Sequence, residues 1–219
     1  MILEDLVMLG KTHPETDRQG RKTVCSVFFS PELRQPVRVY PLSTKNLPPD
    51  FSVCEIKLER NPKDTRHESW KIFGPRGVDV HEEINSRIKV KSILNDKESV
   101  LSMIPTVSSI KEANERKLSI AMVEPEGYVK YVLEKNKDIK DAVSSKSYPW
   151  IPRLKFKTGT TNHKLKFLNQ DVFKNMSKNS HGSVDHILDL ISDSPRLLVG
   201  NMFAHRNNWL VISAFKKAQ

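Results

Sequence analysis

The chain has 219 residues, of which 37% are hydrophobic and 28% charged, and its formal net charge is +10. This length suffices for one large domain or two small ones, each with a real core. The longest apolar stretches fall far short of the roughly 20 residues that a membrane helix needs. Glu4 and Asp5 lie where a signal peptide would carry cations. We therefore expect a globular, cytoplasmic protein with no membrane partner.

The first 75 residues are rich in predicted strands. Apolar, β-branched runs alternate there with turn residues and prolines. The predicted strands are Leu6–Leu9, Thr23–Phe29, Val37–Leu42, Val53–Leu58 and Trp70–Phe73. Short strands at this spacing are typical of a small barrel or sandwich.

The middle of the chain changes period. Apolar residues at helical spacing, interrupted at Pro105, predict two short helices over 96–104 and 107–117. A strand is expected from Leu118 to Val123. We find no internal sequence repeat and no Gly/Ser-rich linker. The expected organisation is a β-rich module over 1–90 and a mixed α+β part over 91–219, with a single domain as the alternative.

The last third contains a predicted β-hairpin. Leu154–Lys157 and Lys164–Phe167 alternate strictly between cationic and apolar residues, with turn residues between them. A helix is expected after Ser183, and two strands at Leu197–Val199 and Trp209–Ile212. The predicted fold class is therefore α+β, with more strand than helix.

Positive charge is concentrated around this hairpin. Between Tyr128 and Lys178 there are twelve cations and four anions, so this segment carries 12 − 4 = +8 of the net +10. Side chains alternate between the two faces of a strand, so the hairpin cations share one face. Like charges opposite each other repel, and nucleic-acid phosphates would relieve that repulsion. The alternative is that these lysines maintain solubility or protect a sheet edge.

The predicted nucleic-acid contacts lie in two parts of the chain. Arg60 and Arg66 belong to a polar loop before Trp70, which could bind an anion or form a surface turn held by that tryptophan. Tyr148 and Trp150 precede the hairpin, where aromatic rings could stack on bases. The hairpin cations are Arg153, Lys155, Lys157, Lys164 and Lys166.

Asp50, Glu55 and Lys57 are the candidate catalytic residues. An acid-x-Lys triplet on a strand, preceded by an aspartate, is how many Mg²⁺-dependent nucleases arrange their site. Asp50 precedes Glu55 by only five positions, which is a tight spacing for that arrangement. The alternative is the solvated face of a strand. Magnesium is expected only under the nuclease hypothesis, and no other cofactor is expected.

Cys25 and Cys54 are the two cysteines of the chain. Two cysteines cannot form a zinc site alone, and no Cys-x-x-Cys pair occurs. Both lie in strand-like apolar runs, which favours buried, reduced thiols. We therefore predict neither a metal site nor a catalytic thiol.

Several segments in a fixed order resemble a group of uncharacterised prokaryotic proteins of similar length. They are 11–15, 23–25, 38–42, 60–70, 199–200 and 209–212. The resemblance implies a prokaryotic, phage or mobile-element source. It implies no activity and assigns no catalytic residue.

Three functions remain open from the sequence. The first is a non-enzymatic nucleic-acid-binding protein, with DNA and RNA as equal alternatives. The second is a Mg²⁺-dependent nuclease whose basic hairpin holds the substrate. The third is a protein–protein inhibitor or adaptor whose basic face meets an acidic partner.

Overall fold

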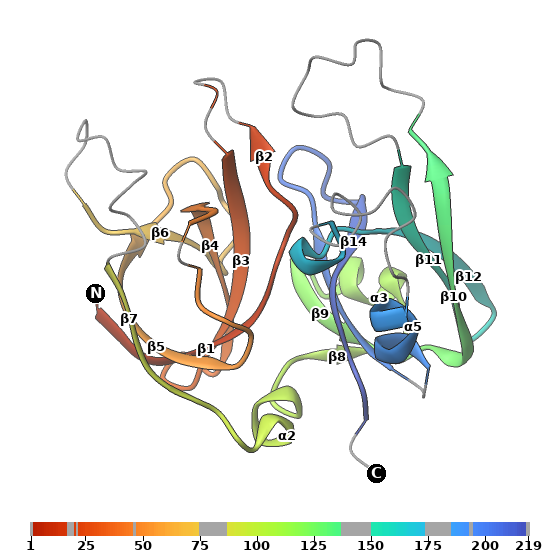
Figure 1. Cartoon of the computed structure of the whole chain (residues 1–219), viewed down its shortest axis with the longest axis horizontal. Coiled ribbons are helices and arrows are strands. Elements are labelled where there is room, and N and C mark those ends of the chain that lie inside the picture. Colours follow the sequence, from red (N-terminus) through yellow and green to blue (C-terminus); the bar gives the residue numbers. More distant parts are fainter. Residues whose placement is uncertain are drawn as a thin grey trace. The chain divides into compact units, whose positions relative to one another are not determined.

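The structure is a computed structural model, and it describes residues 2–16, 20, 22–45, 47–74, 87–136, 150–173, 185–192 and 195–217. The chain divides into two compact units, Met1–Ile104 and Pro105–Gln219. We call them the N-terminal unit and the C-terminal unit. Figure 1 shows a strongly curved sheet in each.

The N-terminal unit consists mainly of strands. A short helix, α2 (Lys97–Leu101), follows the last strand and is capped by Asp96, whose side chain accepts a hydrogen bond from the Ser99 amide. The strands are β1 (Ile2–Lys11), β2 (Glu15–Thr16), β3 (Lys22–Ser30), β4 (Gln35–Ser43), β5 (Ser52–Arg60), β6 (Ser69–Ile72) and β7 (Ile88–Ile93).

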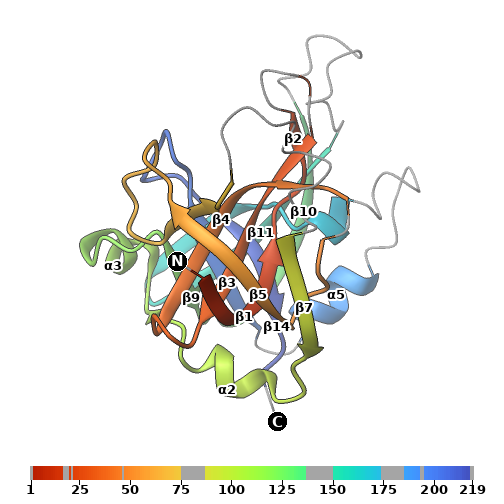
Figure 2. The same cartoon turned by 90° about the vertical axis from the view of Figure 1, so that its left-hand side faces the viewer.

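Five of these strands form a closed barrel. Their hydrogen-bonded order is β1-β3-β4-β6-β5, and the β1–β5 pairing closes the circle. The β4–β6 pair is parallel, while the other neighbours in the barrel are antiparallel. Numbered along the chain, the five strands follow the order 1-2-3-5-4-1, which is the arrangement of the OB-fold, a five-stranded Greek-key barrel. β7 adds to β5 outside this circle (Figure 2).

The C-terminal unit repeats this strand order. The helices whose bounds lie within its described residues are α3 (Ile110–Glu115) and α5 (Asp185–Ile191). Its strands are β8 (Thr106–Val107), β9 (Ile120–Val123), β10 (Glu126–Lys135), β11 (Trp150–Thr158), β12 (Thr161–Phe167), β13 (Arg196–Asn201) and β14 (Trp209–Phe215).

The sheet of the C-terminal unit runs β10-β11-β12-β14-β13-β9-β8. β9 and β10 are separated only by Glu124 and Pro125, so together they act as one interrupted first strand. That strand pairs with β11 through β10 and with β13 through β9. With β12 and β14 pairing in parallel, the order is again that of the OB-fold. β11 and β12 therefore correspond to strands 2 and 3 of this barrel.

Each unit has its own hydrophobic core. The N-terminal core gathers side chains such as Leu6, Phe28 and Ile56 from the barrel strands. The C-terminal core includes Phe156 and Phe167 from the hairpin. Trp209 joins it, and its indole nitrogen donates to the Asn114 side chain of α3 at 2.8 Å. The apolar face of the hairpin thus packs inward, and its cationic face is left for solvent.

The structure confirms a β-rich chain with a barrel and a few short helices. The two middle helices are shorter than expected, at Lys97–Leu101 and Ile110–Glu115. The expected helix cap Ser183 lies outside the described residues. Four of the described strands were not expected: the two-residue strands β2 and β8, and the longer strands β7 and β10, whose many charged and polar residues indicated non-strand segments. The division at Ile104–Pro105 falls after α2, whereas the sequence placed it near residue 90.

Candidate nucleic-acid interface

The basic hairpin is formed by β11 and β12. The two strands pair from Arg153–Lys166 to Thr158–Thr161, which leaves a two-residue turn at Gly159 and Thr160. Gly159 has a φ of +54°, a conformation that suits tight hairpin turns and that glycine adopts without strain. Its amide donates to the Glu126 carboxylate of β10 at 2.7 Å. The turn is therefore held against the neighbouring strand.

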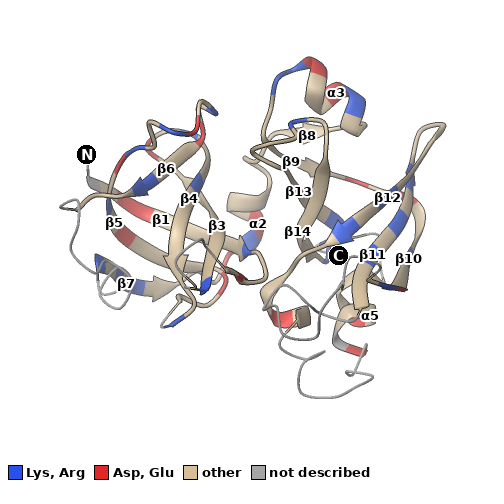
Figure 3. Cartoon of the chain, turned by 90° about the horizontal axis from the view of Figure 1, so that it is seen from above, with Lys and Arg blue, Asp and Glu red and all other residues tan. Residues whose placement is uncertain are grey.

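The alternation along the hairpin separates its two faces. Leu154 and Phe156 are buried, whereas Lys155 and Lys157 are exposed. On β12, Lys164 is exposed and Phe167 is buried. Blue positions recur along these strands in Figure 3. Lys155, Lys157 and Lys164 therefore lie on the exposed face of the hairpin, whereas Arg153 and Lys166 are half-buried.

Three lysines form a row across this face. Lys130 of β10 pairs with Lys155 of β11, and Lys155 pairs with Lys164 of β12. Directly opposed like charges destabilise a sheet. Lys130, Lys155 and Lys157 form no ion pair within the part of the chain that the structure describes. Their charges are therefore available to an external anion.

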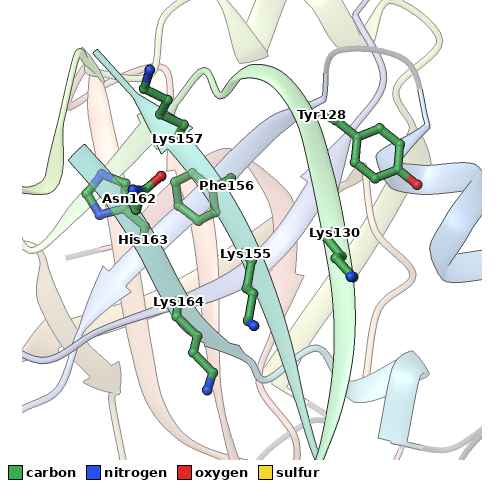
Figure 4. Close-up of a pocket in the computed structure, with 8 residues that line it drawn as sticks. All are labelled: Tyr128, Lys130, Lys155, Phe156, Lys157, Asn162, His163 and Lys164. Carbon is green, nitrogen blue, oxygen red and sulfur yellow. The ribbon is translucent and has the colours of Figure 1, made fainter. Parts of the chain in front are cut away.

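A hollow of about 460 Å³ lies along these lysines (Figure 4). Lys130, Lys155, Lys157 and Lys164 line it, together with Tyr128 and Asn162. In Figure 4 the side chains of Lys155 and Lys164 extend toward one end of the hollow, and Lys157 toward the other. The hollow thus presents positive charge along its length.

A β-bulge in β10 places Tyr128 beside the hollow. Between the pairs Glu126–Lys157 and Lys130–Lys155, β10 has three residues where β11 has one. Gly127 within this bulge has a φ of +69°. Tyr128 is 78% exposed, so its ring is free for a planar ligand to stack on.

Glu134 of β10 is an anion within this cationic face. Its Oε2 lies 2.6 Å from Arg153 Nε, and its Oε1 forms an ion pair with Lys164. The Lys164 hydrogen bond, with help from the Arg153 charge, holds the pKa of the Glu134 carboxyl below its ordinary range. Two of the five hairpin cations therefore share one internal counter-ion, which leaves the group a net charge of 2 − 1 = +1.

By its register His163 belongs with the inward-facing Phe156, although both residues also line part of the hollow. It pairs with Phe156, and the two ring centroids are 5.0 Å apart. Its Nε2 is hydrogen-bonded to the Thr158 hydroxyl at 2.7 Å. Burial lowers the pKa of His163, which keeps the ring neutral at physiological pH. At that pH His163 adds no positive charge to the hairpin.

The two predicted aromatic contacts differ from Tyr128 in position. Trp150 is 41% exposed at the start of β11, but its place in the alternation is that of Leu154 and Phe156 rather than of the cations. Tyr148 lies outside the described residues. Lys166, at the opposite end of the hairpin from the turn, is half-buried.

Arg60 and Arg66 lie in the N-terminal unit, around the loop between β5 and β6. Arg66 is buried and forms hydrogen bonds with both carboxylate oxygens of Asp64. Ser69 donates to the same carboxylate at 2.7 Å. Arg60 stacks over Trp70 at 4.1 Å and donates to the His67 carbonyl. Both arginines thus help to hold the loop together.

The three candidate catalytic residues have separate partners. Asp50 forms an ion pair with Lys11 at 2.8 Å, and Glu55 forms one with Lys89 at 2.8 Å. Lys57 lies over the Phe73 ring at 4.3 Å. No group of three or more His, Cys, Asp or Glu that could hold a metal ion occurs among the described residues.

Sequence reasoning did not identify Tyr128, Lys130 and Glu134 as site residues. They lie on β10, which was not recognised as a strand. Val129, Tyr131 and Leu133 recur at every second position, with Lys130 and Glu134 among the residues between and beyond them, and that period of two, interrupted only by the apolar Val132, was the available signal. These residues lie close to β12 only because β10 and β12 both pair with β11, and the sequence does not reveal that strand order.

The comparisons with known proteins are sparse. No curated protein matches the sequence. One solved structure, described as "Crystal structure of Ifi202 HINa domain in complex with 20bp dsDNA", covers 99% of this chain and 100% of its own at 13% identity and a TM-score of 0.35. This similarity is too weak to support a fold assignment, which depends instead on the strand order given above. No helix among the described residues is long and apolar enough to span a membrane.

A family described as "Domain of unknown function (DUF8758)" matches residues 3–118, which is more than half of the chain. The match includes the whole N-terminal barrel and extends through α3. The basic hairpin lies beyond the matched residues. The chain belongs to the DUF8758 family.

Proposed function

We propose that this protein binds nucleic acid, and that the phosphates contact the lysine-lined hollow on β10, β11 and β12. The observation that supports this most directly is the row of Lys130 and Lys155, with Lys157 beside it, left without internal counter-ions in the described structure. Phosphates that neutralise these lysines release counterions, which supplies binding free energy. They also remove the repulsion between neighbouring strands.

The fold is consistent with this placement. OB-folds bind oligonucleotides on the face of strands 2 and 3, and these strands are β11 and β12 here. A shared fold does not by itself imply a shared function. The proposal therefore depends on the lysines and Tyr128.

The form of nucleic acid that we propose is a single strand. Tyr128 is largely exposed beside the lysines. A ring in this position can stack on an unpaired base, whereas a duplex keeps its base faces inside the helix. The DNA and RNA alternatives both satisfy this chemistry. An acidic protein partner, the other hypothesis for the basic face, would not need the aromatic ring.

Fluorescence anisotropy with labelled single-stranded and duplex DNA and RNA tests this proposal. We expect the single strands to bind more tightly than the duplexes. Tyr128→Ala should weaken single-strand binding by about 1–3 kcal/mol, the usual contribution of one stacked base. Tyr128→Phe should retain it. The control is Phe73→Ala, which removes another exposed aromatic ring, in the N-terminal unit. Equal binding by Tyr128→Ala and wild type would contradict the single-strand proposal.

The nuclease hypothesis is the second candidate, and the same panel tests it when Mg²⁺ is added. Asp50 and Glu55 are each engaged by a different lysine, which favours a binding protein over an enzyme. We expect no Mg²⁺-dependent cleavage. Cleavage by pure protein that Glu55→Gln abolishes would reverse this ranking. A cytoplasmic location and a prokaryotic or mobile-element source stay predictions.

A further inference from the structure

Glu134 reaches across the candidate interface in a way that the strand register makes clear. On β10 it pairs with Ile151, yet its carboxylate contacts Arg153 on β11 and Lys164 on β12. One side chain therefore spans three strands. Lys164 is also the last member of the row that begins at Lys130. The contact places a negative charge at one end of the lysine-lined hollow.

A carboxylate and a phosphate are competing ligands for the same donors. Both present oxygen atoms that accept charge-assisted hydrogen bonds from lysine and arginine. The side chains of Glu134 and Lys164 are 31% and 46% exposed, so solvent and ions reach the pair. Exposed pairs of this kind contribute little to stability, because solvent screens both charges. A phosphate can therefore displace the Glu134 carboxylate from Lys164 at low cost.

We propose that Glu134 is a built-in competitor for nucleic-acid phosphates, which weakens their binding to Lys164 and Arg153 and so limits affinity at this end of the hollow. This inference depends on the proposed nucleic-acid function. The phosphate path then follows Lys157, Lys155 and Lys130, which form no ion pair in the described structure. Glu126 is the cross-strand neighbour of Lys157, but its carboxylate accepts a hydrogen bond from the Gly159 amide. At Lys164 a nucleic-acid phosphate must displace the Glu134 carboxylate. This competition favours rapid release of the nucleic acid over tight binding.

The test compares Glu134→Gln with Glu59→Gln. Glu59 forms a similar ion pair with Lys71, at 2.7 Å, and its side chain is 34% exposed, but it lies in the N-terminal unit. Both changes raise the net charge by one, so the difference between them isolates the local effect. We expect Glu134→Gln to bind single-stranded oligonucleotides about three- to tenfold more tightly than Glu59→Gln at low salt. The slope of log affinity against log salt should steepen by about one unit.

A double-mutant cycle with Lys164→Gln separates competition from a structural role. If Glu134 acts by occupying Lys164, removing Lys164 should shrink the gain from Glu134→Gln. A gain that is equally large without Lys164 would contradict the inference. Thermal unfolding of each variant checks that the fold survives, as expected for a partly exposed side chain.

The remaining outcomes are distinguishable. If wild type binds and Glu134→Gln matches Glu59→Gln, the competitor role is wrong while the proposed function stands. If Glu134→Gln binds more weakly than Glu59→Gln, Glu134 positions Arg153 and Lys164 instead of competing with the ligand, and the inference is overturned. If neither wild type nor Glu134→Gln binds, the proposed function fails and the inference fails with it.

Discussion

Single lysines in this protein have opposite effects on folding and on the proposed binding. Lys155 lies directly between Lys130 and Lys164, so it repels a like charge on each side. Lys157 instead lies between Glu126 and Asn162. Both residues line the hollow, but they differ in their cost to the fold. This difference is measurable.

We expect Lys155→Thr to stabilise the C-terminal unit by about 0.5 kcal/mol at low salt while weakening nucleic-acid binding. The stabilisation should shrink as salt screens the repulsion. Lys157→Thr is the matched control and should weaken binding without the same gain. Urea unfolding at low and high salt measures both. A loss of stability in Lys155→Thr would show that the lysine row is not repulsive.

The two cysteines also differ at the residue scale. Cys54 is fully buried in β5, and burial raises its pKa to about 12, so the reactive thiolate is scarce at neutral pH. Cys25 is half-buried, and its sulfur accepts a hydrogen bond from Arg38 at 3.5 Å. The sequence predicted that both thiols are buried, and the structure shows Cys54 buried and Cys25 half-buried.

The thiol prediction is checked with a neutral-pH thiol reagent and mass spectrometry of the labelled sites. We expect Cys54 to react only when the protein unfolds, and Cys25 to react first in the native protein. The Cys25→Ser variant serves as the control, since any native labelling that it retains must come from Cys54. Rapid labelling of that variant would contradict the burial of Cys54.

At the scale of elements, the hairpin turn determines how the cationic face is presented. Gly159 has a positive φ, and no atom lies within 4 Å of the position where a Cβ would stand. A side chain there has room, so its cost is conformational and amounts to about 1–2 kcal/mol.

We therefore expect Gly159→Ala to destabilise the C-terminal unit by about 1 kcal/mol in urea unfolding. Thr160→Ala, in the same turn, is the control and should change the free energy of unfolding by less than about 0.5 kcal/mol. Equal effects from the two changes would mean that the positive φ at Gly159 carries no strain for alanine.

The elements show which features a sequence can reveal. The alternation of Lys155 and Phe156 is local, because a strand has a period of two, and so the cationic face could be predicted. The ion pair of Glu134 with Lys164 depends on β10 lying next to β11, which joins residues distant in the chain. Barrel closure by β1 and β5 is non-local in the same way. Pairings between strands that are distant in the chain produce no periodic pattern in the sequence, so the sequence alone did not predict them.

At the scale of the whole molecule, the chain contains two units with the same strand order but without a recognisable sequence repeat. Hydrophobic alternation suffices to build each barrel, so the outward-facing residues are free to differ. In the N-terminal unit, Arg66 and Glu55 are engaged in ion pairs. In the C-terminal unit, the outward-facing lysines of β10 and β11 form no ion pairs in the described structure. The proposed function therefore belongs to the second barrel.

The salt dependence of binding tests the central claim most directly, because its slope counts neutralised phosphates rather than affinity alone. The test variant carries Lys130→Gln, Lys155→Gln and Lys157→Gln. The control carries Lys111→Gln, Lys216→Gln and Lys217→Gln, three exposed lysines with acidic partners of their own. We predict that the test variant loses about two to three units of slope, at roughly 0.7–0.9 per contact. The control should keep the wild-type slope. Equal slopes in wild type and the folded test variant would contradict the account.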